Sequence, residues 1–181
     1  MALRDTTKGY SWLSIALHWV AAITVIAMYV IAEQAEELPK AESREMMQLH
    51  ISIGTALFLV LAFRILWRIF NTRPALPAQP MILDQLARWV PVALLAGIAI
   101  MLISGPLIVW SNGAAINIFD LVSLPSPITK NHDLHELAEE IHEFGVTLLK
   151  IALGLHVLGV IKHLVINRDG TLKKMLVPQN R

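Results

Sequence analysis

The 181-residue chain is 55% hydrophobic and only 16% charged, and its mean hydropathy of +0.57 is typical of a membrane protein. Its formal net charge of +1 excludes little, but the lack of cysteine excludes disulfides, iron–sulfur clusters, thiolate nucleophiles and covalently attached haem. The seven histidines and seven methionines are therefore the only soft or borderline metal ligands available.

Four long apolar stretches predict an all-α fold, an integral membrane four-helix bundle that forms one domain. The spans cover roughly residues 11–32, 46–70, 86–110 and 134–167, and each is long enough for a hydrocarbon layer about 30 Å thick. The first stretch follows two basic residues, as a signal peptide does. Its apolar run is too long and no A-x-A site follows it, so we expect a retained span.

The connections between the predicted spans are short. Residues 74–80 are rich in proline and predict a stiff loop between the second and third spans. The loop from Ser111 to His132 opens on an Asn-Gly turn and contains two prolines. Asp133 and Glu136 form a capping-box pattern, which predicts that the fourth helix begins before its apolar run.

The distribution of basic residues predicts that both termini lie in the cytoplasm. Under strict alternation, eleven Lys and Arg residues lie on the side of the termini and three on the other, which is the positive-inside pattern. The inner eleven are Arg4, Lys8, Arg64, Arg68, Arg73, Arg88, Lys162, Arg168, Lys173, Lys174 and Arg181. The outer side has eleven of the fourteen acidic residues.

Histidines lie in or beside three of the four predicted spans, where ionisable residues are rare and usually functional. A lone one can equally be a hydrogen-bonding packing residue. His142 and His156 are 14 residues apart, which places them about 40° apart on the helix surface and about 21 Å apart along its axis. One face of the fourth helix therefore presents two imidazoles at two depths.

The other two histidines match these depths. His50 lies in the outer half of the second span, as His142 does in the fourth, and His18 lies further in, nearer to His156. Two opposed imidazoles on facing helices are what a six-coordinate haem requires. Gly54, Gly145 and Gly159 follow three of these histidines by three or four residues. We expect them to leave room for a flat macrocycle, although glycine is also common at ordinary membrane helix contacts.

Several short motifs together resemble the bacterial cytochrome b561 family, and the resemblance covers essentially the whole chain. They are I-A-L-H-W, L-H-I-S-I-G, F-R-I-L-W-R followed by R-P, E-I-H and G-L-H fourteen residues apart, K-H-L, and the ending D-G-T-L-K-K-M. The resemblance implies a four-helix bundle in the bacterial inner membrane with two b haems per chain. It also implies electron transfer to or from quinone, with superoxide as a donor in some members. The implied haem ligands are His18, His50, His142 and His156.

Four residues at inner helix ends are candidates for contact with quinone or with a haem propionate. His163 lies seven residues beyond His156 and only about 20° away on the helix face, so it is a rival ligand. It lies further inward than His18, so we expect it to contact a propionate or a quinone instead. Lys162, Arg64 and Arg68 are the other candidates, and Lys162 is also a plausible surface anchor.

The other candidate ligands and charged residues also have simpler structural interpretations. Lys150 lies near mid-membrane and can extend toward the outer surface, neutralise a propionate or lie on a proton path. His132 and His135, with His142, can be imagined as a metal site, but we favour exposed polar residues at a helix start. Met101 is the only soft ligand in the third span, and we expect it to pack.

The charge distribution and the histidines leave three functions open. An acidic outer surface repels anions, which weakens superoxide as a substrate on that side and suits a basic or neutral donor. The first hypothesis is a di-haem membrane oxidoreductase linked to the quinone pool. The second is an electron-transfer membrane subunit that serves a partner redox protein. The third is a haem-free transporter whose histidines move protons or bind a metal.

Overall fold

The computed structural model describes residues 4–75 and 79–178 of the chain. The helices are α1 (Trp12–Glu37), α2 (Lys40–Ala56), α3 (Phe58–Phe70), α4 (Met81–Ser111) and α5 (His132–Ile161). A π-helical turn, η1 (Lys162–Asn167), continues α5, and a 3₁₀ turn, η2 (Leu172–Met175), follows it. The strands β1 (Ile116–Ile118) and β2 (Val122–Leu124) pair antiparallel. The fold is therefore a helical bundle with one small hairpin, not purely α.

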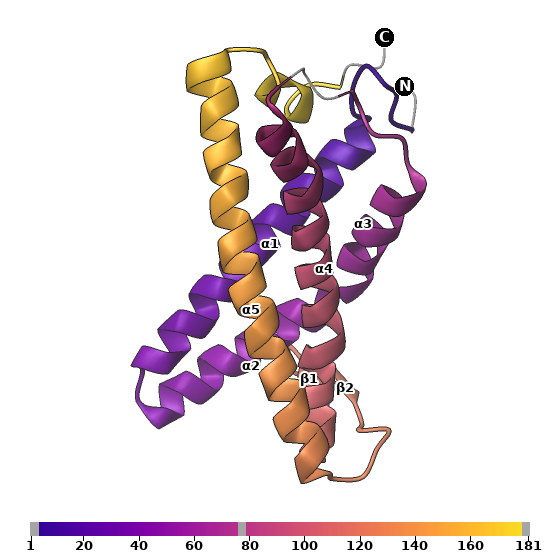
Figure 1. The fold of residues 1–181 in the computed structure, drawn as a ribbon. Helices are drawn as coiled ribbons and strands as arrows, with labels where there is room; N and C mark the ends of the chain where they lie inside the picture. The colour runs from indigo at the N-terminus through magenta and orange to yellow at the C-terminus, as the bar shows by residue number, and fades with distance from the viewer. Residues whose placement is uncertain (1–3, 76–78, 179–181) are drawn as a thin grey trace.

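Within the described residues, three helical segments are long and apolar enough to cross a membrane, namely α1, α4 and α5 with its π-helical turn. The α2–α3 pair becomes a fourth span if it is counted as one bent element. The two ends of the chain lie at the same end of the bundle (Figure 1), as an even number of crossings requires. Arg181 and residues 76–78 of the proline-rich loop lie outside the described residues.

The predicted second span is broken rather than continuous. Helix α2 begins at Lys40, earlier than expected, and ends at Ala56, and α3 then continues at an angle of 46°. Leu57 at the break has ψ near 0° and belongs to neither helix. Gly54 and Thr55 just before it are poor helix formers, and no proline lies within the pair. Local sequence therefore weakens the helix where it bends.

The ends of α1 and α5 are set by local hydrogen bonds. Ser11 caps α1 by accepting a hydrogen bond from the backbone N–H of Ser14, and Pro39 follows its last turn. The predicted capping box at Asp133 and Glu136 was wrong by two residues. Asn131 is the cap of α5, because its side-chain oxygen accepts from the Leu134 N–H.

Helices α4 and α5 form the most extensive helix pair, and they run side by side along most of their length (Figure 1). Glycine allows this close approach at two positions. A Cβ on Gly97 would lie 2.6 Å from Leu149, and one on Gly145 would lie 2.3 Å from the Met101 methyl and 2.6 Å from Ile100. The expectation that Gly145 leaves room for a macrocycle was therefore wrong, since the α4 side chains fill that space.

We predict that Gly145→Ala destabilises the bundle by about 1–3 kcal/mol, because the added methyl group overpacks the α4–α5 contact. Gly154→Ala is the matched control, since a Cβ there meets nothing within 4 Å. Thermal unfolding in detergent should show a lower midpoint for Gly145→Ala only. Equal midpoints in the two variants would contradict this packing role.

Candidate functional site

The histidines form two pairs, which we call outer and inner after the orientation predicted from the sequence. The outer pair combines His50 of α2 with His142 of α5, and both side chains are half-buried. His50 Nδ1 lies 3.0 Å from the Met28 carbonyl oxygen of α1, and His142 Nδ1 lies 2.9 Å from Ser104 Oγ of α4. The two imidazoles are close enough for their charges to interact. The contacts of this pair therefore involve four helices, namely α1, α2, α4 and α5.

The hydrogen bonds of the outer pair assign the same tautomer to both rings. A carbonyl oxygen only accepts, so His50 Nδ1 must carry the proton. The Ser104 hydroxyl donates to the Ile100 carbonyl at 2.7 Å, so its oxygen accepts from His142 Nδ1–H. In each neutral imidazole the lone pair is then on Nε2. Metal-bound histidines show this arrangement, in which the second nitrogen donates to a protein acceptor.

The inner histidine pair combines His18 of α1 with His156 of α5. The two ring centroids are 6.1 Å apart and the ring planes are inclined by 56°. Imidazole nitrogen binds a first-row metal at about 2 Å, and two such bonds with two half-rings together span about 6 Å. The 6.1 Å separation therefore fits two imidazoles that would together hold one haem iron.

Arg64 of α3 lies near this inner pair. Its charge interacts with His18, and it is itself surrounded by Arg68, Tyr10 and Asp5. Arg68 points elsewhere, with its guanidinium 5.7 Å from the centre of the Tyr10 ring and Nη1 bonded to the Thr72 carbonyl. Arg64 is thus the better placed of the two arginines to face an anionic group beside His18.

His163 and Lys162 form a separate group on η1, at the end of α5. His163 Nδ1 lies 2.7 Å from Asp169 Oδ2, and the Lys162 ammonium donates to Asn167 Oδ1 at 3.2 Å. Among the described residues, no hydrogen bond or ion pair joins these two side chains to Arg64 or Arg68. His163 and Lys162 therefore have different polar partners from Arg68, which contacts Tyr10 and Thr72.

The outer candidates that the sequence left open have local partners. Lys150 Nζ lies 3.1 Å from Glu33 Oε1 and 4.6 Å from the centre of the Tyr29 ring, so it extends toward the outer end of α1. His132 and His135 pair with glutamates one turn on. Residues 4–75 and 79–178 contain no group of three or more His, Cys, Asp or Glu side chains placed to hold a metal ion. Met101 packs against the buried core around Leu149.

The hairpin next to the outer pair was not anticipated from sequence. Ser52 Oγ donates to the Asn117 carbonyl at 3.1 Å and accepts from the Phe119 N–H at 3.1 Å. Gln48 Nε2 also donates to the Asn117 carbonyl, at 2.7 Å. These two α2 residues flank His50 on either side, so the hairpin holds the helix segment that carries the histidine.

A second missed network ties the start of α1 to α3. The buried Asp5 carboxylate accepts from the Ser11 N–H at 2.7 Å and from the Ser14 hydroxyl at 2.8 Å. The Trp67 indole N–H donates to the same hydroxyl at 2.7 Å. Asp5 precedes the first apolar stretch, in a segment without helical or strand periodicity. No sequence pattern therefore predicted these hydrogen bonds.

Comparison with known proteins identifies relatives along nearly the whole chain. Residues 9–178 match the family described as prokaryotic cytochrome b561. "Cytochrome b561 homolog 2" of Escherichia coli (strain K12) is 28% identical over 97% of this chain and 95% of its own length. "Probable superoxide oxidase CybB" of Yersinia pestis is 29% identical over 96% of this chain and 98% of its own.

We predict that Ser104→Ala lowers haem affinity at the outer histidine pair by about 10–100-fold, because His142 Nδ1–H loses the acceptor that orients the ring. Ser111→Ala is the matched control, since this buried serine of the same helix contacts His135, which is not a candidate ligand. Haem retained after dilution in detergent should fall in the first variant alone. Full retention in Ser104→Ala would contradict the orienting role.

Proposed function

Because this chain belongs to the prokaryotic cytochrome b561 family, we propose that it binds two b haems, one through His50 with His142 and the other through His18 with His156. In this proposal it carries electrons across the bacterial inner membrane, to or from the quinone pool. Haem supplies one-electron chemistry at each site. The protein supplies the imidazole nitrogens, their orientation and the apolar surroundings.

The geometry of the histidine pairs is the observation that carries this proposal. The inner rings are separated by 6.1 Å, and each outer ring has Nδ1 engaged and Nε2 available. Because His142 and His156 come from one helix, about 21 Å apart along its axis, the two haems would lie at different depths. Two sites at different depths suit transfer across a membrane.

The charge distribution supports quinone on the inner side. We place both termini in the cytoplasm, so that His163, Lys162, Arg64 and Arg68 lie near the inner haem. Arg64 beside His18 suits a haem propionate, whereas His163 on η1 suits a quinone oxygen. Hydrogen-bond donors there would stabilise the negative charge that develops on a quinone as it is reduced.

The outer haem would exchange electrons with a donor that is neutral or positively charged. Eleven acidic residues against three basic ones repel a small anion from this surface. The Yersinia pestis relative carries the name of a superoxide oxidase, which keeps superoxide as a candidate donor here. Reduction of the purified protein by superoxide at physiological salt, compared with reduction by quinol, tests this point.

The second candidate function is an electron-transfer subunit for a partner redox protein, and the acidic outer surface favours it. Such a subunit would have no substrate site of its own and would co-purify with its partner. A haem-free transporter is the third hypothesis, and it predicts no haem absorbance. Two six-coordinate b haems, in contrast, predict sharp absorbance bands when the purified protein is reduced.

We predict two haems per polypeptide in the purified protein. His50→Ala or His142→Ala should remove the outer haem and leave the inner one, because each haem depends on its own pair of imidazoles. The haem-to-protein ratio and the reduced absorbance spectrum measure this. One haem per chain in the wild type, or unchanged spectra in both variants, would refute the pairing.

We also predict that His163→Ala keeps both haems and slows reduction by quinol, because His163 contacts the quinone rather than iron. Stopped-flow reduction of the haem bands by a short-chain quinol measures the rate. Loss of a haem would make His163 a ligand. Normal kinetics with both haems present would place the quinone site elsewhere.

A further inference from the structure

The chain reverses direction directly after η1 and brings a carboxylate back to His163. Arg168 and Gly170 have positive φ values of 51° and 72°, which turn the backbone sharply on either side of Asp169. The His163 side chain is 15% exposed and that of Asp169 is 23% exposed, at the surface end of the bundle. His163 and Asp169 are therefore brought together by this turn, and not by one turn of a helix.

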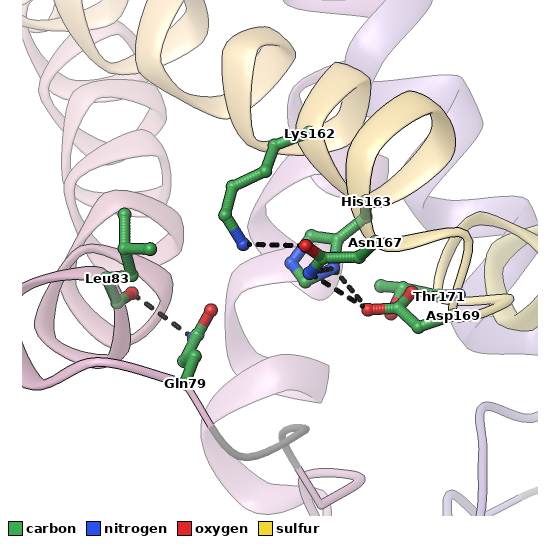
Figure 2. A network of polar contacts seen from close by, with 7 residues as sticks. All are labelled: Gln79, Leu83, Lys162, His163, Asn167, Asp169 and Thr171. Atoms are coloured by element: carbon green, nitrogen blue, oxygen red, sulfur yellow. Dashed lines mark hydrogen bonds and ion pairs between the residues drawn. The ribbon is translucent and has the colours of Figure 1, made fainter.

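Figure 2 shows that the Asp169 carboxylate lies at the centre of a hydrogen-bond network. Its Oδ2 lies 2.7 Å from His163 Nδ1 and accepts from Asn167 Nδ2 at 3.3 Å, and its Oδ1 accepts from the Thr171 N–H at 3.0 Å. Lys162 donates to the other end of Asn167. Hydrogen bonds from Thr171, and then from His163 and Asn167, lower the pKa of Asp169, which keeps it ionised.

The network assigns the orientation of the His163 ring. Nδ1 lies 2.7 Å from the Asp169 carboxylate, which only accepts, and 3.2 Å from Asn167 Nδ2, which only donates. The shorter contact is to the carboxylate, so we assign the proton to Nδ1, and Asn167 Nδ2 then donates to Asp169 Oδ2. Nε2 makes no hydrogen bond within the part of the chain that the structure describes. The hydrogen bond to Asp169 thus occupies Nδ1, and Nε2 is left to bind a ligand.

An open hollow of about 380 Å³ lies against His163, and its lining is mostly apolar with a few polar groups. Its lining residues are His163, Leu164, Arg168, Gly170, Thr171, Leu172, Lys173 and Leu176. A small number of convergent polar groups in an apolar cavity is typical of sites for small organic ligands. An apolar ring that carries oxygen atoms matches this lining.

The segment that forms the far wall of the cavity is attached to α1 beside the inner histidine pair. The Trp19 indole N–H donates to the Met175 carbonyl at 2.8 Å, and the Trp19 ring lies 5.5 Å from that of His18. A ligand in the cavity would therefore lie near the inner pair.

We propose that Asp169 is a positioning residue, which holds His163 so that its Nε2 binds an oxygen atom of a quinone or quinol in this cavity. The inference rests on the proposed function. In the neutral imidazole Nε2 accepts a hydrogen bond from a quinol hydroxyl, and in the imidazolium it donates to a quinone carbonyl. Asp169 holds the ring in place for both forms, as carboxylates do for catalytic histidines.

The test is a double-mutant cycle with His163→Ala, Asp169→Asn and the double variant, all as haem-loaded protein in detergent. Equilibrium binding of a ubiquinone with a single isoprene unit is measured, together with KM and kcat for the corresponding quinol. Asp84→Asn is the matched control, because this acidic residue on the predicted inner side pairs with Arg88 on the surface. Haem content and the unfolding midpoint should be unchanged in every variant.

Each single variant should weaken ubiquinone binding by about five- to tenfold and raise KM more than it lowers kcat, and Asp84→Asn should do neither. The double variant should bind no more weakly than His163→Ala, because Asp169 acts through His163. Two results would overturn the positioning role but not the quinone site. One is a double variant whose loss of binding equals the sum of the two single losses. The other is Asp169→Asn that binds ubiquinone like the wild type while His163→Ala binds it more weakly. Wild-type binding by His163→Ala would overturn the site itself.

A spectroscopic measurement covers the case in which Asp169→Asn does not fold. Histidine ¹⁵N spectra of the wild-type protein, assigned by comparison with His163→Ala, should show a protonated Nδ1 at His163. An unprotonated Nδ1 would contradict the hydrogen bond to Asp169 and with it the inference.

Discussion

Hydrocarbon surroundings offer an imidazole no water, so the protein must engage its ring nitrogens. In the outer pair the Met28 carbonyl and Ser104 engage Nδ1 of each ring, and the proposed function uses the other nitrogen of each ring as a haem ligand. This requirement links the helices to one another. Helix α1 must present the Met28 carbonyl to His50, and α4 must approach α5 closely enough for Ser104 to reach His142. The close α4–α5 contact at Gly97 and Gly145 allows that approach.

The splayed arrangement of the other helices follows from the same pairs. Helix α5 carries one histidine of each pair, so its two partners must come from different helices at different depths. Helix α1 supplies His18 and α2 supplies His50, and the two helices diverge from α5 toward the outer end (Figure 1). The bend at Leu57 changes the direction of the chain between α2, which carries His50, and α3, whose Trp67 indole meets Ser14 near the start of α1.

The two ends of the bundle are built differently, and the proposed electron route uses that difference. At the outer end the hairpin bonds to α2 through Gln48 and Ser52 and holds the segment around His50. At the other end the chain turns back after α5 and lines an open hollow beside His163. In the proposed function, the first end exchanges electrons at its surface and the second binds a quinone.

The sequence alone determined the number of apolar stretches, the family, and the depth at which each histidine lies. All of these depend on distance along a helix, which rises by a constant amount per residue. The structure places His18 beside His156 as depth had predicted. Ligation of iron by the four histidines stays a prediction.

Only the tertiary structure decided which side chains meet. It moved the α5 cap to Asn131, broke the second span at Leu57 and filled the space beside Gly145 with Met101 and Ile100. It also brought Asp169 to His163. The physical reason is that sequence periodicity gives the depth and the face of a residue on its own helix. The rotation and tilt of one helix against another, and the path of a turn with positive φ, depend on packing between segments far apart in the chain.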